Sequence, residues 1–433
     1  MPKTLIIQVA ALGHEFLQTH RPAARMADLE FRSIRSVFPA LTCTVQATIR
    51  TARPPASHGM VGNGFFSREF ARPFFWEQSA SLVEGPRIWD AFREAGHTVG
   101  VLFWQQSLGP HADLILSPAP IHKHHGGMIQ DCFSRPAGLY DRLCRAIGRP
   151  FNLAHYWGPR ASLKAGTWIT RATAEVMDDP APDLLLTYLP HLDYDLQRHG
   201  PDSPTAAEAL DGLENCLTDL LDAAQRSGYR VLVFGDYAIS PVSRTVHPNR
   251  LLRQAGLFRP RRVSKMTYAD LYTSEAFALV DHQIAHVIAR SESAGQQARE
   301  LFENTGGVRT VLGPEKKARM GLDHPRAGDL ILTADPDAWF AYPWWTDGEK
   351  PPDYATHVDI HNKPGYDPCE LFWGFWPIST STDPSRIRGS HGLTGWAGTA
   401  ATWASTFALP DRPDTLLDLA GVMGEILSSD ASP

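Results

Sequence analysis

The stretch FPALTCTVQATIRTARPPASHGMVGNGFF, residues 38–66, decides how this chain is interpreted. After Pro39 it predicts a helix that begins near Thr42, among small hydroxyl residues, and that ends before Pro-Pro and Gly-Asn-Gly turns. Unpaired amides and the positive end of the dipole favour an anion at a helix N-terminus. Most Thr residues near a helix start are caps, but a hydroxyl there also makes Thr42 the candidate nucleophile.

The order of features in this stretch resembles the nucleophile segment of the alkaline phosphatase superfamily, in its nucleotide pyrophosphatase/phosphodiesterase branch. In that branch a Thr is followed by a second Thr, by Ser-His-Gly and by an Asn. Here Thr42 stands nine residues before Thr51, and Ser-His-Gly at 57–59 and Asn63 follow in the same order. The resemblance implies that Thr42 attacks the substrate and also binds a metal ion.

One phosphate-contacting position of the branch is altered. Val45 stands where the branch has an Asn, with Gln46 beside it. The resemblance implies Gln46 and Asn63 as substrate-binding residues. Cys43, next to the candidate nucleophile, is a ligand, a competing nucleophile or a small buried residue, of which the last is the commonest role for a free cysteine.

The composition is that of an ordinary soluble globular protein, with 43% of the 433 residues hydrophobic and 20% charged. The net charge is −6 and the basic residues are scattered, which disfavours a face that binds a nucleic acid duplex. No apolar run approaches the ~18 residues of a membrane span, and the first residues predict a strand rather than a leader peptide. The five cysteines include no Cys-x-x-Cys pair. We expect a cytoplasmic protein that acts on a small phosphoryl or phosphonyl molecule.

Four apolar runs predict buried strands of an α/β protein with a mainly parallel central sheet. They span residues 5–10, 99–104, 183–189 and 229–236. The resemblance implies an alkaline phosphatase-like three-layer sandwich, in which the first strand ends at a metal-binding Asp. Ala10 stands at that position, and Gln8, His14 and Glu15 are nearby substitutes with more ordinary structural roles.

The segment after residues 183–189, PHLDYDLQRHGP, resembles the branch's metal-binding pattern Pro-Asp-x-x-x-His-x-x-Gly-Pro. Counting back from Gly-Pro places Asp193 at the Asp and Gln197 at the His. Asp195 and His199 have the same spacing but lose the Gly-Pro register. The resemblance therefore implies Asp193 as a metal ligand and Gln197 as a weak or vacant one.

Two later segments supply the other implied ligands. Asp236 keeps the branch's carboxylate at a strand end, where open α/β sheets place their sites, whereas Tyr237 replaces the branch's His and becomes a substrate-binding candidate. The sequence RGSHG resembles the branch's late Gly-x-His-Gly and makes His391 the strongest histidine candidate. HVDIHNKPGYDP adds Asp359 and His361 as second-rank ligands.

Residues 248–345 lack the pattern of the sheet strands and are expected to form an inserted cap on a catalytic domain of residues 1–247 and 346–433. His282 and His286 stand four residues apart, a spacing that on a helix places two side chains on one face. The segment DHQIAH resembles one in phosphonoacetate hydrolase-like members, which implies that His282 lies at the edge of the site and binds substrate. A structural His pair is the alternative.

The implied function is metal-dependent hydrolysis of a phosphodiester, pyrophosphate or phosphonate bond in a nucleotide-like small molecule. Thr42 would attack phosphorus, and one or two divalent ions, zinc by preference, would stabilise the attacking and leaving oxygens. Asp193 and His391 are expected to hold one ion, and Asp236 with Thr42 the other.

Three replaced ligand positions, Ala10, Gln197 and Tyr237, weaken the case for an ordinary zinc pair. Two alternatives stay open. One is a group transferase of a biosynthetic pathway, with a single ion bound by Asp193, His391 and a recruited residue such as His361 or Asp236. The other is a non-catalytic relative that binds a ligand.

Overall fold

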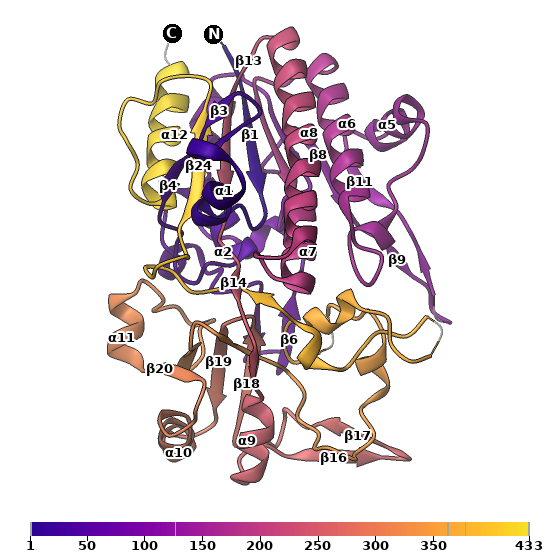
Figure 1. The fold of residues 1–433 in the computed structure, drawn as a ribbon, viewed down its shortest axis with the longest axis vertical. Helices are drawn as coiled ribbons and strands as arrows, with labels where there is room; N and C mark the ends of the chain where they lie inside the picture. The colour runs from indigo at the N-terminus through magenta and orange to yellow at the C-terminus, as the bar shows by residue number, and fades with distance from the viewer. Residues whose placement is uncertain (1, 126, 362, 377, 432–433) are drawn as a thin grey trace.

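A mixed sheet of eight strands forms the centre of the structure, a computed structural model that describes residues 2–125, 127–361, 363–376 and 378–431 (Figure 1). The strand order is β11-β8-β7-β12-β1-β13-β24-β4. Strands β8, β7, β12, β1 and β13 are parallel, and antiparallel pairs add the other three. The bounds are β1 Lys3–Val9, β4 Arg32–Ile34, β7 Val99–Leu102, β8 Leu114–Pro118, β11 Cys132–Arg135, β12 Leu184–Leu189, β13 Tyr229–Gly235 and β24 Ala401–Ser405.

Continuous apolar runs produce the parallel part of this sheet because helices cover both of its faces. Leu5, Ile6 and Ile7 of β1, for example, are fully buried. The four strands predicted from the sequence all form, each within two residues of its expected bounds. The expected α/β fold with a mainly parallel central sheet is thereby confirmed.

Helices form the outer layers of the sandwich. Helices α6 and α8 pack on each other and against β12 and β13, while α12 lies on the opposite side in Figure 1 and packs against α2. The main helices are α2 Thr42–Thr51, α5 Leu139–Ile147, α6 Leu163–Asp178, α7 His191–His199, α8 Pro204–Ser227 and α12 Leu416–Asp430. Shorter helices are α1 His14–His20, α3 Pro55–His58 and α4 Asp90–Glu94.

A second, antiparallel sheet lies below the first in Figure 1, with the order β18-β19-β21-β20. Its strands are β18 Ala276–Asp281, β19 Ile284–Ala289, β20 Val308–Leu312 and β21 Leu330–Ala334, and helices α9 Pro248–Gln254, α10 Glu292–Glu303 and α11 Pro314–Arg319 accompany it. Residues 248–345 therefore do contain sheet strands. The two six-residue apolar runs joined by His282 and Gln283 form a hairpin, so the helical spacing of His282 and His286 was misleading.

Two large hydrophobic clusters underlie the two sheets. The cluster of the second sheet includes Met60, Phe66 and Trp76, which lie far earlier in the chain. Two short strand pairs join segments far apart in the sequence: β14 Ser240–Pro241 with β23 Gly389–Ser390, and β15 Arg244–Val246 with β22 Ala338–Phe340. The other short pairs are local hairpins: β2 Arg25–Met26 with β3 Leu29–Glu30, β5 Gly64–Ser67 with β6 Arg72–Phe75, β9 Ile121–His122 with β10 Met128–Ile129, and β16 Pro260–Val263 with β17 Met266–Ala269. The boundaries of the cap stay a prediction.

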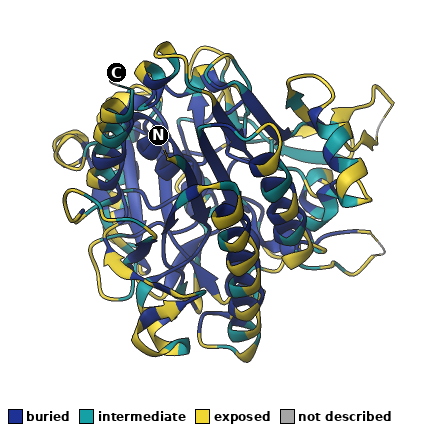
Figure 2. Ribbon diagram, turned by 90° about the horizontal axis from the view of Figure 1, so that it is seen from above, coloured by how far each residue is buried: buried dark blue, intermediate teal, exposed yellow. Residues whose placement is uncertain are grey.

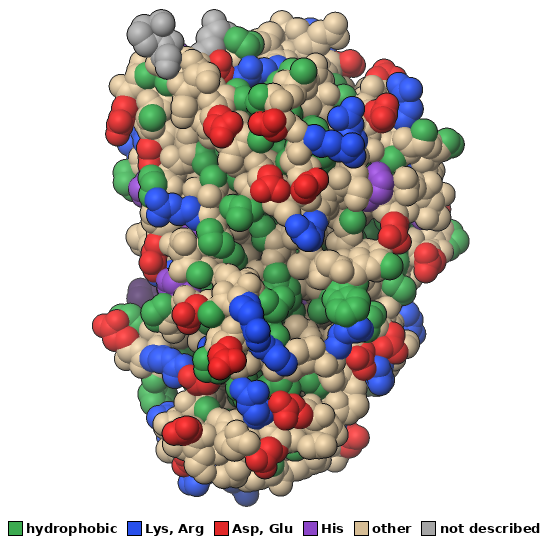
Figure 3. Space-filling model, turned by 90° about the vertical axis from the view of Figure 1, so that its left-hand side faces the viewer, with side chains coloured by type: hydrophobic (Ala, Val, Ile, Leu, Met, Phe, Trp, Pro, Cys, Tyr) green, Lys and Arg blue, Asp and Glu red, His purple; other side chains and the backbone are tan. Residues whose placement is uncertain are grey.

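The surface is ordinary for a globular chain. Buried strands run through the middle of the view in Figure 2, and the outer faces of the helices are exposed. On the face drawn in Figure 3, Lys and Arg side chains are interspersed with Asp and Glu. Within the part of the chain that the structure describes, no helix combines the length and apolarity needed to cross a bilayer.

Candidate active site

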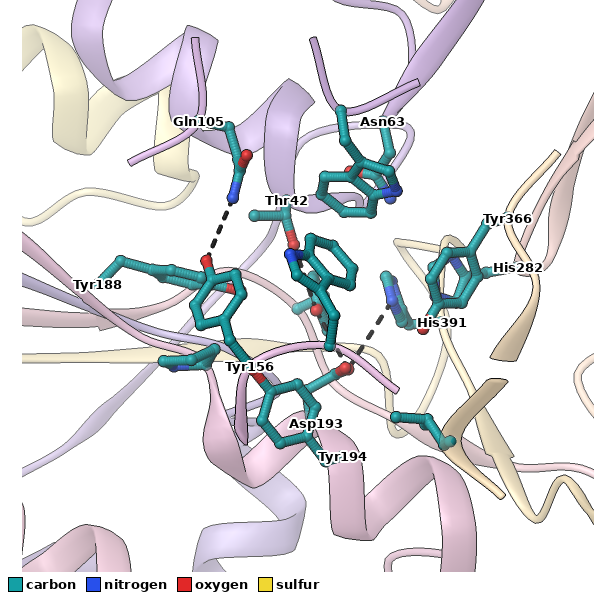
Figure 4. Close-up of a pocket in the computed structure, with 15 residues that line it drawn as sticks. Thr42, Asn63, Gln105, Tyr156, Tyr188, Asp193, Tyr194, His282, Tyr366 and His391 are labelled. Atoms are coloured by element: carbon teal, nitrogen blue, oxygen red, sulfur yellow. Dashed lines mark hydrogen bonds and ion pairs between the residues drawn. The ribbon is translucent and has the colours of Figure 1, made fainter. Parts of the chain in front are cut away.

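A pocket with about 470 Å³ of empty space lies beyond the carboxyl ends of β12 and β13, where open α/β sheets place their sites (Figure 4). Helix α2 brings Thr42 to it, the first turn of α7 brings Asp193, and Tyr237 follows β13. His282 comes from the turn between β18 and β19, and His391 follows β23. Both parts of the molecule therefore contribute to the pocket.

Thr42 is the first residue of α2 and is only 3% exposed. Leu41 precedes it and makes no side-chain cap. The amide of Cys43 donates to Oδ1 of Asn63 over 3.0 Å, whereas the amides of Thr42 and Thr44 have no acceptor among the described residues. Free amides at a helix N-terminus attract an anion. Thr42 thus lies where a phosphoryl group would be held.

The hydroxyl of Tyr237 lies between Thr42 and Asp193. Its oxygen is 3.3 Å from Oγ1 of Thr42 and donates to Oδ1 of Asp193 over 3.2 Å. Burial raises the pKa of Tyr237 well above its ordinary value, so the hydroxyl keeps its proton. A continuous hydrogen-bond chain therefore connects Thr42 to a carboxyl group.

Asp193 is held on its other side by Gln197, one helical turn later. Nε2 of Gln197 donates to Oδ2 of Asp193 over 2.5 Å, and Oε1 of Gln197 accepts from the hydroxyl of Tyr366 over 3.3 Å. Burial raises the pKa of Asp193 to about 7, against the opposing effect of the hydrogen bonds from Gln197 and Tyr237. Asp193 therefore changes its charge near neutral pH.

His391 presents a free ring nitrogen to Asp193. Nδ1 lies 2.8 Å from the carbonyl oxygen of Ala40 and must donate to it, which leaves the lone pair on Nε2. That atom lies 4.0 Å from Oδ1 of Asp193 (Figure 4). Burial, and then the nearby His282, lower the pKa of His391 well below its ordinary value. His391 is thus neutral, with the tautomer of a metal ligand or a base.

His282 is oriented by a buried carboxylate. Its Nδ1 lies 2.9 Å from Oδ1 of Asp281, which also accepts from the side chain of Asn63. Nε2 of His282 is buried without a partner among the described residues. The His282 ring stacks on that of Tyr366, with 4.1 Å between the ring centroids, and its centroid lies 3.8 Å from that of His391. The ring of Tyr237 stacks on that of His391, with 3.5 Å between the centroids.

Asp236 does not line the pocket. Its Oδ2 accepts from Nε2 of Gln8 over 2.8 Å, and its Oδ1 accepts from the amide of Ala11 over 3.0 Å. Burial raises the pKa of this carboxyl well above its ordinary value. The Gln8 side chain therefore bonds to Asp236 and does not replace the metal ligand that is missing at Ala10.

Three other candidates lie behind or beside the pocket. Oε1 of Gln46 accepts from the amide of Gln105 over 2.7 Å, so Gln46 supports the pocket wall. Asp359 and His361 line a neighbouring cavity, and Nδ1 of His361 lies 2.8 Å from the carbonyl oxygen of Phe75. The structure brings together Thr42, Asn63, Asp193, Tyr237, His282 and His391, but not these three.

Two residues weighed in the sequence have structural partners outside the pocket. Asp195 pairs with Arg198 at 3.2 Å. His286 bridges two backbones: its Nδ1 accepts from the amide of Gly328 and its Nε2 donates to the carbonyl of Val61. Cys43 is fully buried and burial raises its pKa to about 12, which leaves it a poor nucleophile.

The donors at the pocket fit one divalent ion rather than two. Oδ1 of Asp193 and Nε2 of His391 face each other, and zinc binds such atoms at about 2.0–2.2 Å. Thr42 offers a hydroxyl close by. For a second ion Ala10 has no donor and Asp236 is already engaged. Among the described residues no group of three His, Cys, Asp or Glu side chains converges as a metal cluster.

The aromatic walls of the pocket were mostly not predicted. The pocket is also lined by Trp76, Tyr156, Trp157, Tyr188, Tyr194 and Tyr366. Tyr366 belongs to the PGYDP sequence that follows His361 and Tyr194 to the segment of Asp193, which could have indicated them, whereas the others stand in no motif. No Lys or Arg occurs among the described lining residues. Positive charge at the pocket must therefore come from the start of α2 or from a bound cation.

A mainly parallel sheet with a pocket at the carboxyl ends of its strands is the architecture expected of an alkaline phosphatase-like protein. The family described as type I phosphodiesterase / nucleotide pyrophosphatase matches residues 20–367, and the chain belongs to this family. No curated protein sequence matches the chain.

Solved structures confirm the fold at low sequence identity. Phosphonoacetate hydrolase from Sinorhizobium meliloti, in complex with phosphonoformate, is 17% identical, with a TM-score of 0.64 over 100% of this chain and 96% of that one. Murine ectonucleotide pyrophosphatase / phosphodiesterase 5 is 14% identical, with a TM-score of 0.61 and the same coverage. An inactive Thr-to-Ala variant of the murine protein, in complex with AMP, matches equally well.

Proposed function

We propose that this pocket hydrolyses a phosphodiester, pyrophosphate or phosphonate bond in a nucleotide-like small molecule, with Thr42 as the nucleophile. The observation that carries the proposal is the hydrogen-bond chain from Thr42 through Tyr237 to Asp193 at the N-terminus of α2. Family membership supports the reaction class. Phosphonoformate and AMP in similar folds, the latter with an inactive Thr-to-Ala variant, support the ligand class and a reactive Thr.

In the proposed reaction Oγ of Thr42 forms a bond to phosphorus while the bond from phosphorus to the leaving group breaks. The proton of Thr42 moves to Oη of Tyr237, as Tyr237 gives its own proton to Oδ1 of Asp193. Water then attacks phosphorus and the bond from phosphorus to Oγ of Thr42 breaks. The proton on Asp193 returns through Tyr237 to Thr42, and the proton that water loses neutralises the departed leaving group. The amides at the start of α2 hold the phosphoryl oxygens throughout.

Asp193 and His391 are the residues that would hold a divalent ion. When bound, the ion would take the place of the proton that Asp193 receives from Tyr237, stabilise negative charge on the oxygens at phosphorus and lower the pKa of a bound hydroxyl. Elemental analysis tests this assignment. We expect about one equivalent of metal in the wild-type protein, loss of it in Asp193→Ala and His391→Ala, and retention in the control Asp195→Ala.

Hydrolysis of p-nitrophenyl phosphodiesters tests the function. Thr42→Ala should lower kcat by about 10³-fold or more, and Thr42→Ser should retain part of the activity because it keeps the hydroxyl. Thr51→Ala is the matched control: Thr51 is also buried on α2 but bonds only to the carbonyl of Ala47. Undiminished turnover by Thr42→Ala would refute the proposed nucleophile.

A second candidate, group transfer to an acceptor other than water, is favoured by the enclosure of the site. Thr42, Tyr237 and His391 are each exposed by 3% or less, behind aromatic walls. Adding alcohols to the same assay tests it, since a transferase forms a new phosphodiester with the alcohol faster than it forms the phosphomonoester that water produces. Ligand-induced stabilisation with no product of either kind would instead indicate a non-catalytic relative.

A further inference from the structure

A second and larger cavity adjoins the pocket. It contains about 1720 Å³ of empty space, open toward the solvent, and we call it the outer chamber. Its walls come from the loop of residues 118–122, from residues 153–157 and from residues 358–361. Four residues line both the pocket and the outer chamber: Trp76, Gln105, Tyr156 and Trp157. These four side chains therefore form the boundary between the pocket and the outer chamber.

The shared wall is aromatic. The rings of Trp76 and Trp157 meet edge to face at 5.0 Å, and those of Tyr156 and Trp157 at 5.4 Å. Nε2 of Gln105 donates to the hydroxyl of Tyr156 over 3.2 Å, which orients that ring (Figure 4). Such a wall offers apolar surface to a group that extends from one cavity into the other.

The lining of the outer chamber excludes negative charge. Pro118, Pro120 and Leu153 give it apolar surface, while Glu77 and Asp359 add carboxylates. Among the described residues no Lys or Arg lines it, and its basic side chains are His122 and His361, of which His361 has Nδ1 2.8 Å from the carbonyl oxygen of Phe75. A second phosphate, or any other anionic group, would be desolvated there without a Lys or Arg to pair with.

The rim is apolar as well. Met128 and Val358 line the chamber and are 41% and 44% exposed. Exposed apolar side chains gathered around a cavity mark a surface that binds apolar groups.

We propose that the outer chamber binds an uncharged apolar ester group of the substrate. The substrate is then a phosphodiester with one apolar alcohol, rather than a pyrophosphate or another polyanion. This proposal rests on the proposed function, since it places phosphorus at Thr42 and the apolar group beyond Trp76 and Trp157.

Alkyl p-nitrophenyl phosphates with methyl, butyl and hexyl groups test the proposal, because p-nitrophenolate release is measured in the same way for all three. Full burial of a methylene increases affinity about threefold to fourfold, so kcat/KM should increase at least about tenfold from methyl to hexyl. The 5-carboxypentyl ester is the matched charged control, and its kcat/KM should not exceed that of the methyl ester.

Variants at the chamber separate its role from catalysis. Ala119 and Ala154 line the outer chamber but not the pocket, so Ala119→Trp and Ala154→Phe should abolish the gain from methyl to hexyl and leave the rate of the methyl ester unchanged. Equal rates for methyl and hexyl esters in the wild-type protein would overturn the proposal.

Calorimetric binding of the same esters to Thr42→Ala distinguishes the two proposals. If the wild-type protein hydrolyses no ester, but hexyl binds to Thr42→Ala at least about tenfold more tightly than methyl and Ala119→Trp removes the difference, the chamber is supported and the hydrolase function fails. If esters are hydrolysed without any dependence on chain length, in rate or in binding, the hydrolase function stands and the chamber proposal fails.

Discussion

At the scale of single residues, the hydroxyl of Tyr237 is the unexpected feature of the site. The sequence indicated that Tyr237 replaces a metal-binding His and is a substrate-binding candidate. In the structure its ring stacks on His391 and its hydroxyl bonds to both Thr42 and Asp193. The replacement therefore supplies a hydroxyl between the proposed nucleophile and a carboxyl group. In our account this is how the site compensates for the altered ligand set.

Tyr237→Phe tests this role. The substitution keeps the stacked ring and removes the hydroxyl, so kcat should fall about 10²-fold while the melting temperature changes little. Tyr229→Phe is the matched control, because the buried hydroxyl of Tyr229 donates only to the carbonyl of Pro182, away from the pocket. Equal activity of Tyr237→Phe and the wild-type protein would remove Tyr237 from the mechanism.

The pKa of Asp193 predicts a pH-dependent stability. It is raised from 3.8 to about 7 by burial, so between these values the folded protein binds more protons than the unfolded chain and the free energy of unfolding falls as pH increases. Asp193→Asn removes the ionisable group and with it this decrease in the free energy of unfolding. In chelator-treated protein we expect the variant to be more stable than wild type by roughly 1–3 kcal/mol at pH 8, with little difference near pH 4.

Urea unfolding of both proteins at the two pH values gives the free energies. A constant difference across this range would show that Asp193 does not titrate near neutral pH in the folded protein.

At the scale of elements, the hairpin of β18 and β19 positions the far side of the pocket. His282 occupies its turn with a φ of 62°, a left-handed conformation that glycine adopts more readily. Asp281, at the end of β18, accepts from the amide and the side chain of Asn63 at 2.7 and 3.0 Å, and from His282. One carboxylate thus ties the hairpin to the segment that follows α2.

Asp281→Ala should therefore destabilise the protein by about 2–4 kcal/mol, because it leaves buried donors of Asn63 and His282 unpaired. We also expect reduced activity, since both residues line the pocket. The control Asp347→Ala removes a side chain that is 97% exposed and should change stability by less than ~0.5 kcal/mol. Denaturant unfolding measures both, and a similar loss in the two variants would contradict this role of Asp281.

The sequence predicted elements well where the pattern was local. The parallel strands follow from continuous apolar runs, and α2 from the turn and hydroxyl residues around Thr42. The β18–β19 hairpin was missed because two His residues at helical spacing stand in short apolar runs that suit either structure. Hairpin pairing depends on partners that periodicity does not reveal.

The order of the sequence motifs predicted part of the site. The nucleophile segment, the α7 segment and the late Gly-Ser-His-Gly led to Thr42, Asp193 and His391, which the structure brings to one pocket. Asp359 and His361 also stand in a motif, but the chain path takes them to the outer chamber. The partnership of Gln8 with Asp236 joins neighbouring strands and could not be derived from spacing alone.

At the scale of the whole molecule, the pocket lies where the part of the chain that forms the first sheet meets the part that forms the second. The amide of Gln283 in the hairpin turn donates to the carbonyl of His391 over 2.9 Å, and the amide of Ala40 donates to that of Gly392 over 3.0 Å. These bonds connect the start of α2, the hairpin and the segment after β23. A ligand bound in the pocket should therefore stabilise the protein as a whole.

Zinc or manganese should raise the melting temperature of the metal-free protein. An ion present at 100 times its dissociation constant adds about 2.7 kcal/mol to the free energy of unfolding. We measure the shift for each variant as the difference between its melting temperatures with and without metal. The shift should be absent in His391→Ala and intact in the control His286→Ala, because the His286 side chain bonds to backbone groups away from the pocket. An equal shift in both variants would place the ion elsewhere.

Trapping the covalent intermediate tests the central claim most directly. The protein is mixed with p-nitrophenyl phosphodiester, quenched in acid within the first turnovers, digested and analysed by mass spectrometry. We predict that the peptide containing Thr42 gains the mass of the phosphoryl ester group in the wild-type protein and not in Thr42→Ala. Turnover with the modification on another residue, or turnover that persists in Thr42→Ala, would contradict Thr42 as the nucleophile.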